Sequence, residues 1–246
     1  ATLGHINIAE SIDMGELAEG VPYLVLEFLD GRSLADAIRY AGRFTVRRAL
    51  RIARQIACGL EIAHDHGIIH RDLKSDNVFL THRDDNPEHV KILDFGVARV
   101  LGRGSGATKP GFLVGTPDFM APEQIADPAH LDHRVDVYAA GVILHHMLTG
   151  HLPFGDDLPV ATLLHRILHE APAPLPAELP AEVHQLVGDA MAYDRDRRIA
   201  SMSELRARID ELAPTATARG SRRIPIVPGL ATGTPRDGGS PSASVA

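Results

Sequence analysis

The longest periodic pattern of apolar residues runs from position 45 to position 66. Alanine, isoleucine and leucine recur there every three or four residues, while the arginines fall on other faces. This spacing predicts an amphipathic helix. Thr45 can cap its start, and Gly67 stands where a left-handed residue commonly ends a helix. Shorter patterns of the same period predict further helices at 33–42, 134–149, 158–170, 180–193 and 201–212.

Three short apolar runs favour extended structure instead. Residues 23–29 (YLVLEFL) are rich in β-forming side chains and end at a glycine-containing turn. The runs 78–80 and 90–93 stand on either side of a polar stretch, 82–89, which has the composition of a turn. We therefore predict one strand near 23–29 and a hairpin whose two strands flank the polar stretch.

Two segments carry neither pattern. From 97 to 120 glycine, threonine and serine prevail, and irregular segments this long inside a domain are usually functional or disordered. From 214 to 246 the chain consists mostly of proline, glycine, alanine, serine and threonine. Such a segment cannot bury enough apolar surface to offset its ordering entropy, so we predict a disordered tail.

Composition and charge narrow the classes of protein. With 246 residues, 44% of them hydrophobic, the chain suits one globular domain with an appendage. A net charge of −7 argues against a nucleic-acid binder, and Cys58, the only cysteine, allows no internal disulfide. The longest apolar stretch, 135–148, is too short for a membrane span and includes polar residues. We therefore expect a cytoplasmic protein without a membrane segment.

A cluster of polar residues between two apolar runs carries the candidate chemistry. Asp72 supplies a carboxylate, Lys74 a cation and Asn77 an amide oxygen, and Asp94 follows the second strand of the predicted hairpin. Phosphoryl transfer to a hydroxyl needs a carboxylate that accepts the proton, a cation that neutralises phosphoryl oxygens, and oxygen ligands for Mg²⁺. A solvated surface loop is the alternative interpretation.

Five motifs resemble, in the same order, those of eukaryotic-type protein kinases. They are HRDLKSDN (70–77), DFG (94–96), GTPDFMAPE (115–123), DVYAAGVIL (136–144) and DRDRRIAS (194–201). One such motif is weak evidence, whereas five in the right order identify the chain as a member of this family. Lys74, two residues after Asp72, and Thr116 in GTPDF favour the bacterial-like serine/threonine class.

The resemblance implies an α+β, protein-kinase-like fold with a mainly helical C-terminal lobe and a partial β N-terminal lobe. Residues 1–30 are then a remnant of the small lobe and hinge, 31–213 the C-terminal lobe, and 214–246 the tail. The resemblance also implies ATP and Mg²⁺ as the bound groups, protein serine and threonine hydroxyls as acceptors, and no nucleic-acid partner.

The resemblance assigns the chemistry to four residues. Asp72 would be the catalytic base, and Lys74 would contact the transferring phosphoryl group. Asn77 and Asp94 would hold Mg²⁺.

Three residues would bind the adenine of ATP. Glu27 and Leu29 resemble hinge positions that bond the ring through backbone groups, and Phe79 would lie beneath it. Phe79 could equally belong to the core, because apolar pocket walls and core residues look alike in sequence.

Four residues would be structural. His70 resembles an architectural histidine, and Asp136 would accept backbone N–H bonds from the catalytic loop. Glu123 and Arg198 would form a buried ion pair, whose disruption would leave an uncompensated charge.

Arg71, Thr108 and Thr116 would be regulatory. A phosphate on Thr108 could pair with Arg71 and order the loop, and Ser105 is a second candidate for modification. Thr116 would hydrogen-bond near the catalytic residues. An unmodified flexible loop is the alternative.

The family pattern begins with a glycine-rich hairpin, a strand lysine and a helix glutamate, none of which the sequence shows. No lysine precedes Lys74, and GRGSGA (102–107) fails the G-x-G-x-x-G spacing and follows the DFG motif. Kinases need the strand lysine and the helix glutamate in place for activity. We therefore expect a serine/threonine kinase domain that is inactive as this chain alone. The alternative is a pseudokinase or scaffold module without phosphotransfer, against which the intact catalytic residues argue.

Overall fold

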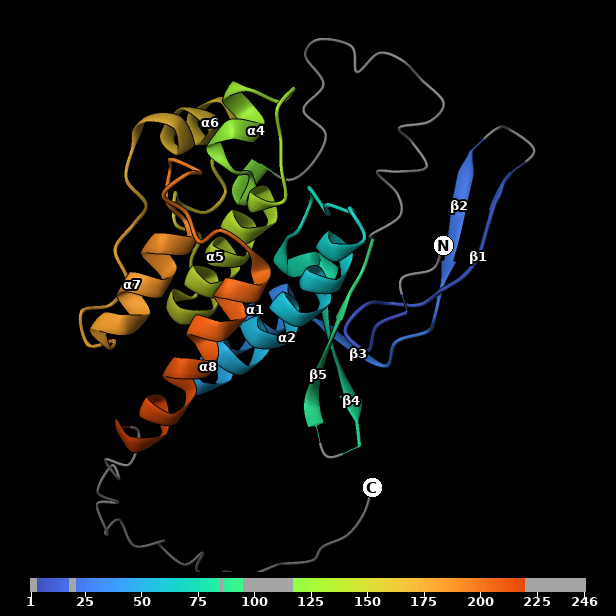
Figure 1. The fold of residues 1–246 in the computed structure, drawn as a ribbon, viewed down its shortest axis with the longest axis horizontal. Coiled ribbons are helices and arrows are strands. Elements are labelled where there is room, and N and C mark those ends of the chain that lie inside the picture. The colour runs from blue at the N-terminus through green and yellow to red at the C-terminus, as the bar shows by residue number, and fades with distance from the viewer. Residues whose placement is uncertain (1–3, 18–20, 85, 95–116, 220–246) are drawn as a thin grey trace, which may run out of the picture.

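The chain folds into a body of helices with two small β-sheets beside it (Figure 1). The fold is that of a computed structural model, which describes residues 4–17, 21–84, 86–94 and 117–219, with the backbone alone from 213 onward. The helices are α1 (Leu34–Ala41), α2 (Val46–Asp65), α4 (Pro122–Ala126), α5 (Arg134–Thr149), α6 (Val160–His169), α7 (Ala181–Ala190) and α8 (Met202–Arg219). The strands are β1 (Ser11–Glu16), β2 (Pro22–Leu26), β3 (Gly31–Ser33), β4 (Val78–Arg83) and β5 (Asn86–Ile92). The α+β architecture with a mainly helical C-terminal part is therefore confirmed.

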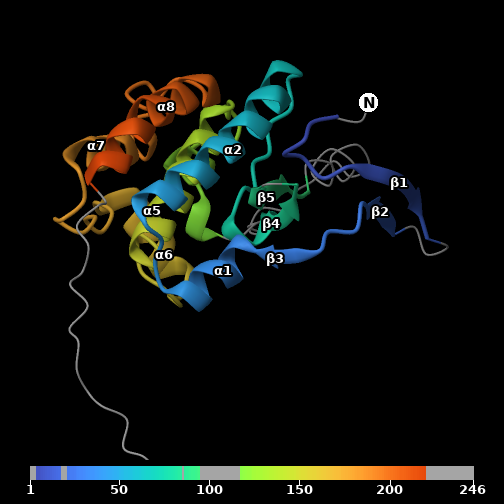
Figure 2. The same cartoon turned by 90° about the horizontal axis from the view of Figure 1, so that it is seen from below.

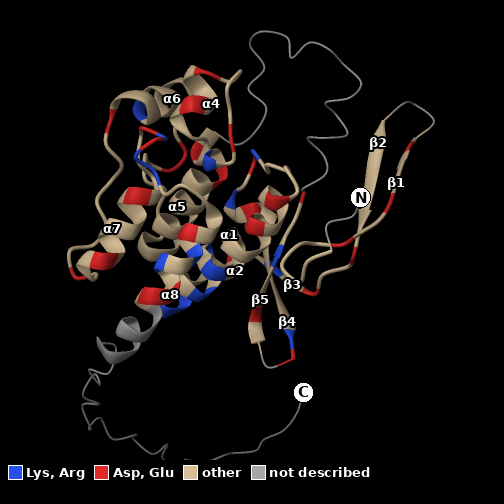
Figure 3. Cartoon of the chain, viewed as in Figure 1, with Lys and Arg blue, Asp and Glu red and all other residues tan. Residues whose placement is uncertain are grey.

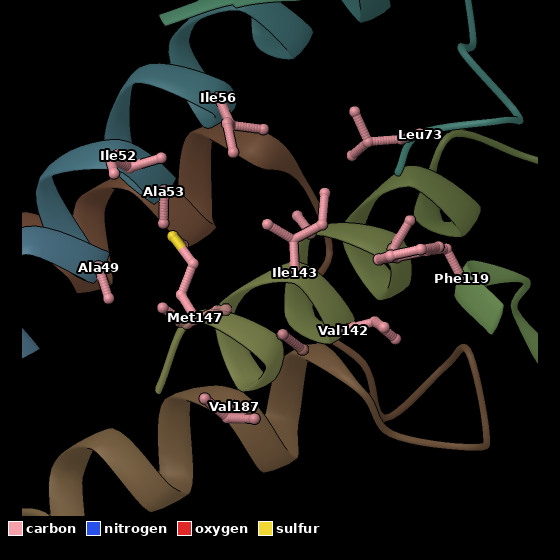
Figure 4. Packing of buried hydrophobic residues seen from close by; sticks show 14 of the residues in the cluster. Ala49, Ile52, Ala53, Ile56, Leu73, Phe119, Val142, Ile143, Met147 and Val187 are labelled. Atoms are coloured by element: carbon pink, nitrogen blue, oxygen red, sulfur yellow. The ribbon is translucent and has the colours of Figure 1, made fainter. Parts of the chain in front are cut away.

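Two long helices, α2 and α5, form the centre of the helical body. The Thr45 side chain caps α2 by accepting from the Arg48 N–H at 3.4 Å, as the sequence predicts. In α5, 13 of the 16 residues are buried, which is the pattern of a helix inside a core rather than of an amphipathic one. Figure 4 shows the side chain of Met147 of α5 pointing toward Ala53 of α2 in the same apolar cluster. This packing sets the start of α5 against the end of α2.

A hairpin brings the two parts of the candidate site together. The three-stranded sheet has the order β3-β4-β5, with both pairs antiparallel. Val78, the first residue of β4, pairs with Ile92, the last residue of β5. The loop that precedes β4 and the segment that follows β5 therefore lie at the same end of the hairpin.

The N-terminal segment packs against the same sheet. Ile8 forms a parallel bridge with Ile92, and the buried Asn7 donates from Nδ2 to the Val90 carbonyl at 2.9 Å. Gly59 on α2 permits this approach, because a Cβ there would lie 2.9 Å from Ile92 Cδ1. The segment before β1 is thus fixed between α2 and β5.

The second sheet is an antiparallel hairpin of β1 and β2 that stands away from the helices in both views (Figure 2). Its side chains are largely exposed, among them Ile12 and Met14. Strand β2 was predicted but β1 was not, because the alternation of polar and apolar residues in SIDMGE covers only Ser11 to Met14 before Gly15 interrupts it. The strand was also expected to end at 29, whereas β2 ends at Leu26.

Two further regions contain more regular structure than predicted, whereas α6 and α7 are slightly shorter than predicted. The stretch 82–89 was expected to be a turn, but β4 and β5 extend into it, because antiparallel pairing continues through polar residues. Helix α8 extends to Arg219, six residues into the predicted tail, since a helix propagates more easily than it starts. The predicted tail from 220 onward lies outside the described residues, as does 97–116. The short helix α4 was not predicted.

Charged residues on the helical surface are mostly paired. Figure 3 shows basic and acidic residues side by side along α2 and α8. Arg54 of α2 contacts Asp210 of α8 at 2.5 Å, and Arg206 of α8 contacts Glu61 of α2 at 2.9 Å. Each exposed pair contributes only about 0–1 kcal/mol. The apolar face between these helices therefore carries most of their association.

Gly150, which ends α5, should not tolerate a side chain. Its φ is 83°, and a Cβ there would collide with the Gly42 carbonyl oxygen. Left-handed strain and overpacking together predict that Gly150→Ala lowers the free energy of unfolding by about 2–4 kcal/mol in urea titrations. Gly188 on α7 is the matched control, because nothing lies within 4 Å of its virtual Cβ. Gly188→Ala should leave stability unchanged or raise it; equal losses in the two variants would contradict this explanation.

Candidate active site

One buried carboxylate holds the start of the loop between α2 and β4. Asp136, in the first turn of α5, is 1% exposed and accepts from the His70 N–H at 2.8 Å and the Arg71 N–H at 2.9 Å. Its Oδ2 also accepts from His64 Nε2 at 2.7 Å. Arg71 has a φ of 65°, which is costly for a residue other than glycine and persists where surrounding bonds impose it. The core helix α5 therefore fixes the entry into the loop.

His70 joins this loop to the segment that leads to Asp94. Its Nε2–H donates to the Leu93 carbonyl at 2.9 Å, and the Leu93 N–H donates to the Asn77 carbonyl at 2.8 Å. Leu93 directly precedes Asp94, and His70 and Asn77 lie on either side of Asp72 in the loop. The two acidic segments are thus bonded to each other at two points.

Asp72 and Lys74 present opposite charges within reach of solvent. Lys74 Nζ lies 3.8 Å from Asp72 Oδ2, and the two side chains are 22% and 46% exposed. Asn77 is buried and donates from Nδ2 to the Asp72 carbonyl at 3.0 Å. This bond assigns the amide orientation and turns Oδ1 away from that carbonyl. The loop therefore offers an accessible carboxylate, a cation and an amide oxygen.

Asp94 is exposed and has a φ of 65°. Strained backbone at non-glycine residues occurs often at functional sites, and here Arg71 and Asp94 share the same φ on bonded segments. Phe95 and Gly96, which complete the DFG motif, lie outside the described residues.

Asn77 and Asp94 form a donor set that fits Mg²⁺. This ion prefers oxygen ligands and usually completes its shell with waters and substrate phosphates. Across the described ranges, no group of three or more His, Cys, Asp and Glu side chains could hold a metal ion alone. The amide oxygen of Asn77 and the carboxylate of Asp94 are therefore suitable ligands for an Mg²⁺ ion that the phosphates of a nucleotide also coordinate.

Glu27, directly after β2, is held in place by three contacts. Its N–H donates to the Glu10 carbonyl at 2.9 Å, and its Oε1 accepts from the Glu10 N–H at 2.9 Å and from Lys91 Nζ at 2.6 Å. Burial is the largest single influence and raises the pKa of this carboxyl, but the hydrogen bonds from Lys91 and from the Glu10 N–H, together with the charge of Lys91, outweigh it and lower the pKa. Lys91 pairs across the hairpin with the half-buried Phe79. The segment before Leu29 is therefore tied to the three-stranded sheet.

Glu123 on α4 and Arg198, shortly before α8, form a buried ion pair. Two guanidinium nitrogens lie 2.6 and 2.9 Å from the two carboxylate oxygens, and the Arg198 side chain is 0% exposed. Arg198 also donates to the carbonyls of Arg134 at 2.9 Å and Ala192 at 3.0 Å. The pair thus connects α4 with the start of α5 and the end of α7.

Gln124, next to Glu123, extends this connection to the loop. Its Nε2 donates to the Arg71 carbonyl at 3.0 Å, while its Oε1 accepts from the Ala121 N–H at 2.9 Å. The backbone of Arg71 is therefore held from α5 on one side and from α4 on the other.

Some site residues were not found from the sequence, and some predictions stay open. His64 and Gln124 carry no local signal, because their partners are 72 and 53 positions away. Thr108, Thr116 and Ser105 lie outside the described residues. Arg71, which was predicted to meet a phosphate, is exposed.

A strained loop bonded to a second acidic segment, beside a mainly helical body, defines a protein kinase domain. The model of the protein kinase domain family matches residues 1–208. The chain therefore belongs to the protein kinase family.

Bacterial serine/threonine kinases are among the relatives of the chain. It is 38% identical over 175 residues to serine/threonine-protein kinase pkn3 of Myxococcus xanthus, covering 70% of this chain and 32% of that protein. With Pkn1 of the same organism it shares 37% over 206 residues, or 83% of this chain and 29% of that protein. With PknB of Mycolicibacterium smegmatis it shares 35% over 214 residues, or 84% and 33%. The chain spans about a third of the length of these relatives.

The chain thus carries a protein kinase domain of the bacterial serine/threonine type. Among the helices that the structure describes, none combines the length and the apolar character needed to cross a membrane.

Proposed function

We propose that this domain transfers the γ-phosphoryl group of ATP to serine and threonine hydroxyls of proteins. The observation that carries the proposal is the double connection through Leu93. It holds the segment of Asp72 and the segment of Asp94 at one place.

Asp72 is the proposed base. Its carboxylate is half-exposed, so a hydroxyl from a protein acceptor can reach it, and its backbone is anchored through Asn77. Because this transfer depends mostly on positioning and electrostatics, the carboxylate serves by orienting the hydroxyl and accepting its proton. Lys74, 3.8 Å away, supplies positive charge for the oxygens of the transferred group.

Asn77 and Asp94 are the proposed holders of Mg²⁺. The ion, when bound with ATP, neutralises charge on the phosphates. Asn77 contributes the amide oxygen that its bond to the Asp72 carbonyl orients, and Asp94 contributes a carboxylate at the open end of the hairpin.

Glu27, Leu29 and Phe79 are the proposed adenine site. The N–H of Glu27 is already bonded to Glu10, which leaves its carbonyl as the group for the ring. Leu29 follows two residues later, and Phe79 lies on β4 next to β3.

Domain limits, regulation and activity remain predictions. They include the division at 30 and 213, the pairing of Arg71 with a phosphorylated Thr108, the role of Thr116 and the cytoplasmic location. We also predict that this chain alone is inactive, because its sequence shows no glycine-rich loop and no strand lysine before Lys74. If a domain completed by these segments neither binds ATP nor transfers phosphate, the alternative of a scaffold without phosphotransfer would be favoured.

Calorimetric titration of the chain with ATP tests the proposal. We expect that ATP affinity falls when Mg²⁺ is removed by EDTA, and that Asp94→Asn loses this metal dependence. Glu211→Gln, which removes an exposed carboxylate from α8, is the matched control and should keep it. Equal metal dependence in Asp94→Asn and the unmodified chain would contradict the assignment of Asp94.

A further inference from the structure

The catalytic loop contacts α5 at two places. Its first end is bonded to Asp136, as described above. At its second end, Ser75 Oγ lies 3.2 Å from Nδ1 of His146, ten residues further along α5. Asp72 and Lys74 lie between these two contacts.

Ser75 is 1% exposed, so its hydroxyl needs a hydrogen-bond partner inside the protein. It is also the first residue of the 3₁₀ turn Ser75–Asn77, in which the Asn77 N–H donates to the Lys74 carbonyl at 3.1 Å. Lys74, the cap of this turn, makes no side-chain capping bond to it. A contact that fixes Ser75 therefore fixes where the turn begins.

The surroundings of His146 favour an accepting nitrogen at Nδ1. Burial lowers the pKa of this imidazole, Asp156 and Asp76 oppose the shift, and His145 and His151 add to it. The ring is therefore neutral at pH 7. We assign the ring proton to Nε2, so that Nδ1 accepts from the Ser75 O–H.

We propose that His146 is a positioning residue, which holds the second end of the catalytic loop through Ser75 and so sets Lys74 and Asn77 relative to Asp72. His146 contacts none of these three residues through a bond described above. Its effect on catalysis rests on the proposed function, whereas its effect on the loop does not.

Three substitutions distinguish this bond from simple space filling. Ser75→Ala removes the hydroxyl, and its small change in size favours retention of the fold. His146→Gln places an amide near the Nε2 position and loses the acceptor at Nδ1. His146→Asn places its amide near the Nδ1 position and can still accept. His165→Gln, at an exposed histidine of α6, is the control.

Amide hydrogen exchange of Asn77 is the readout that needs no activity. Ser75→Ala and His146→Gln should each speed exchange about tenfold or more, because local opening of the turn becomes easier. The double variant should be no worse than either single one. His146→Asn and His165→Gln should stay within about threefold of the unmodified chain.

Phosphotransfer kinetics form the second readout, measured in a domain completed by a glycine-rich loop and a strand lysine. In the variants that speed exchange, kcat should fall about tenfold. If exchange follows the expected pattern but neither the completed domain nor any of its variants transfers phosphate, the proposed function fails and the positioning contact stands. The inference would be overturned if the exchange rate of the Asn77 amide stayed within threefold of that in the unmodified chain in both Ser75→Ala and His146→Gln. Equal acceleration by His146→Asn and His146→Gln would overturn it too.

Discussion

In a domain completed by the glycine-rich loop and the strand lysine, replacing Asp72 by Asn should lower kcat about 10²–10⁴-fold, which is the usual contribution of a general base. The substitution keeps the shape of the side chain and leaves the Asn77 bond intact, because that bond goes to the Asp72 backbone carbonyl. Stability in urea and the affinity for Mg²⁺ and ATP should therefore stay close to those of the unmodified chain. Transfer of labelled phosphate from ATP to a general serine/threonine acceptor protein, together with calorimetry, measures both.

Asp76 provides the matched control for this prediction. It is an exposed aspartate in the same loop, four residues after Asp72. Asp76→Asn should leave kcat within a few fold. Retained phosphotransfer in Asp72→Asn, or the same loss in both variants, would argue against Asp72 as the base.

Replacing Arg198 by Met should lower the free energy of unfolding by about 3–5 kcal/mol, because Glu123 would keep a buried charge without its partner. The burial of the Arg198 side chain and its two short bonds to Glu123 underlie this expectation. Urea denaturation measures the effect.

The double variant Glu123→Leu/Arg198→Met separates the stranded charge from the loss of packing. It should recover a large part of the stability, since apolar replacements of buried ion pairs are often tolerated. As a surface comparison, Arg39→Met removes an exposed partner of Asp36 and should cost about 1 kcal/mol or less. If Arg198→Met lowered the free energy of unfolding as little as Arg39→Met does, the ion pair of Glu123 and Arg198 would not be an important support of the fold.

Local patterns predicted the helices well, and the reason is visible in α2. Its apolar spacing, its cap at Thr45 and the glycine after its last turn are all encoded within the segment itself. Helix α5 was predicted from a shorter pattern of the same period, although 13 of its 16 residues are buried and no polar face distinguishes it. Strand β1 was missed because its alternation covers only four residues before a glycine, and its pairing with β2 is not visible in the segment itself.

The candidate site shows the same division. Asp72, Lys74, Asn77 and Asp94 were found because phosphoryl-transfer chemistry and family motifs require those residue types at that spacing. The supports around them were harder to find. His64 meets Asp136 because α2 packs on α5, and Ser75 meets His146 because the loop after α2 packs on α5. Contacts more than 70 positions apart leave no trace in either local pattern.

The central claim is that the segments of Asp72 and Asp94 share one bound nucleotide and metal ion. Paramagnetic broadening of backbone amide resonances by Mn²⁺, added with a non-hydrolysable ATP analogue, tests it most directly. The account predicts that the amides of Asp72, Asn77 and Leu93 broaden together, and only when metal and nucleotide are both present. Broadening confined to one of the two segments, or centred elsewhere in the chain, would contradict it.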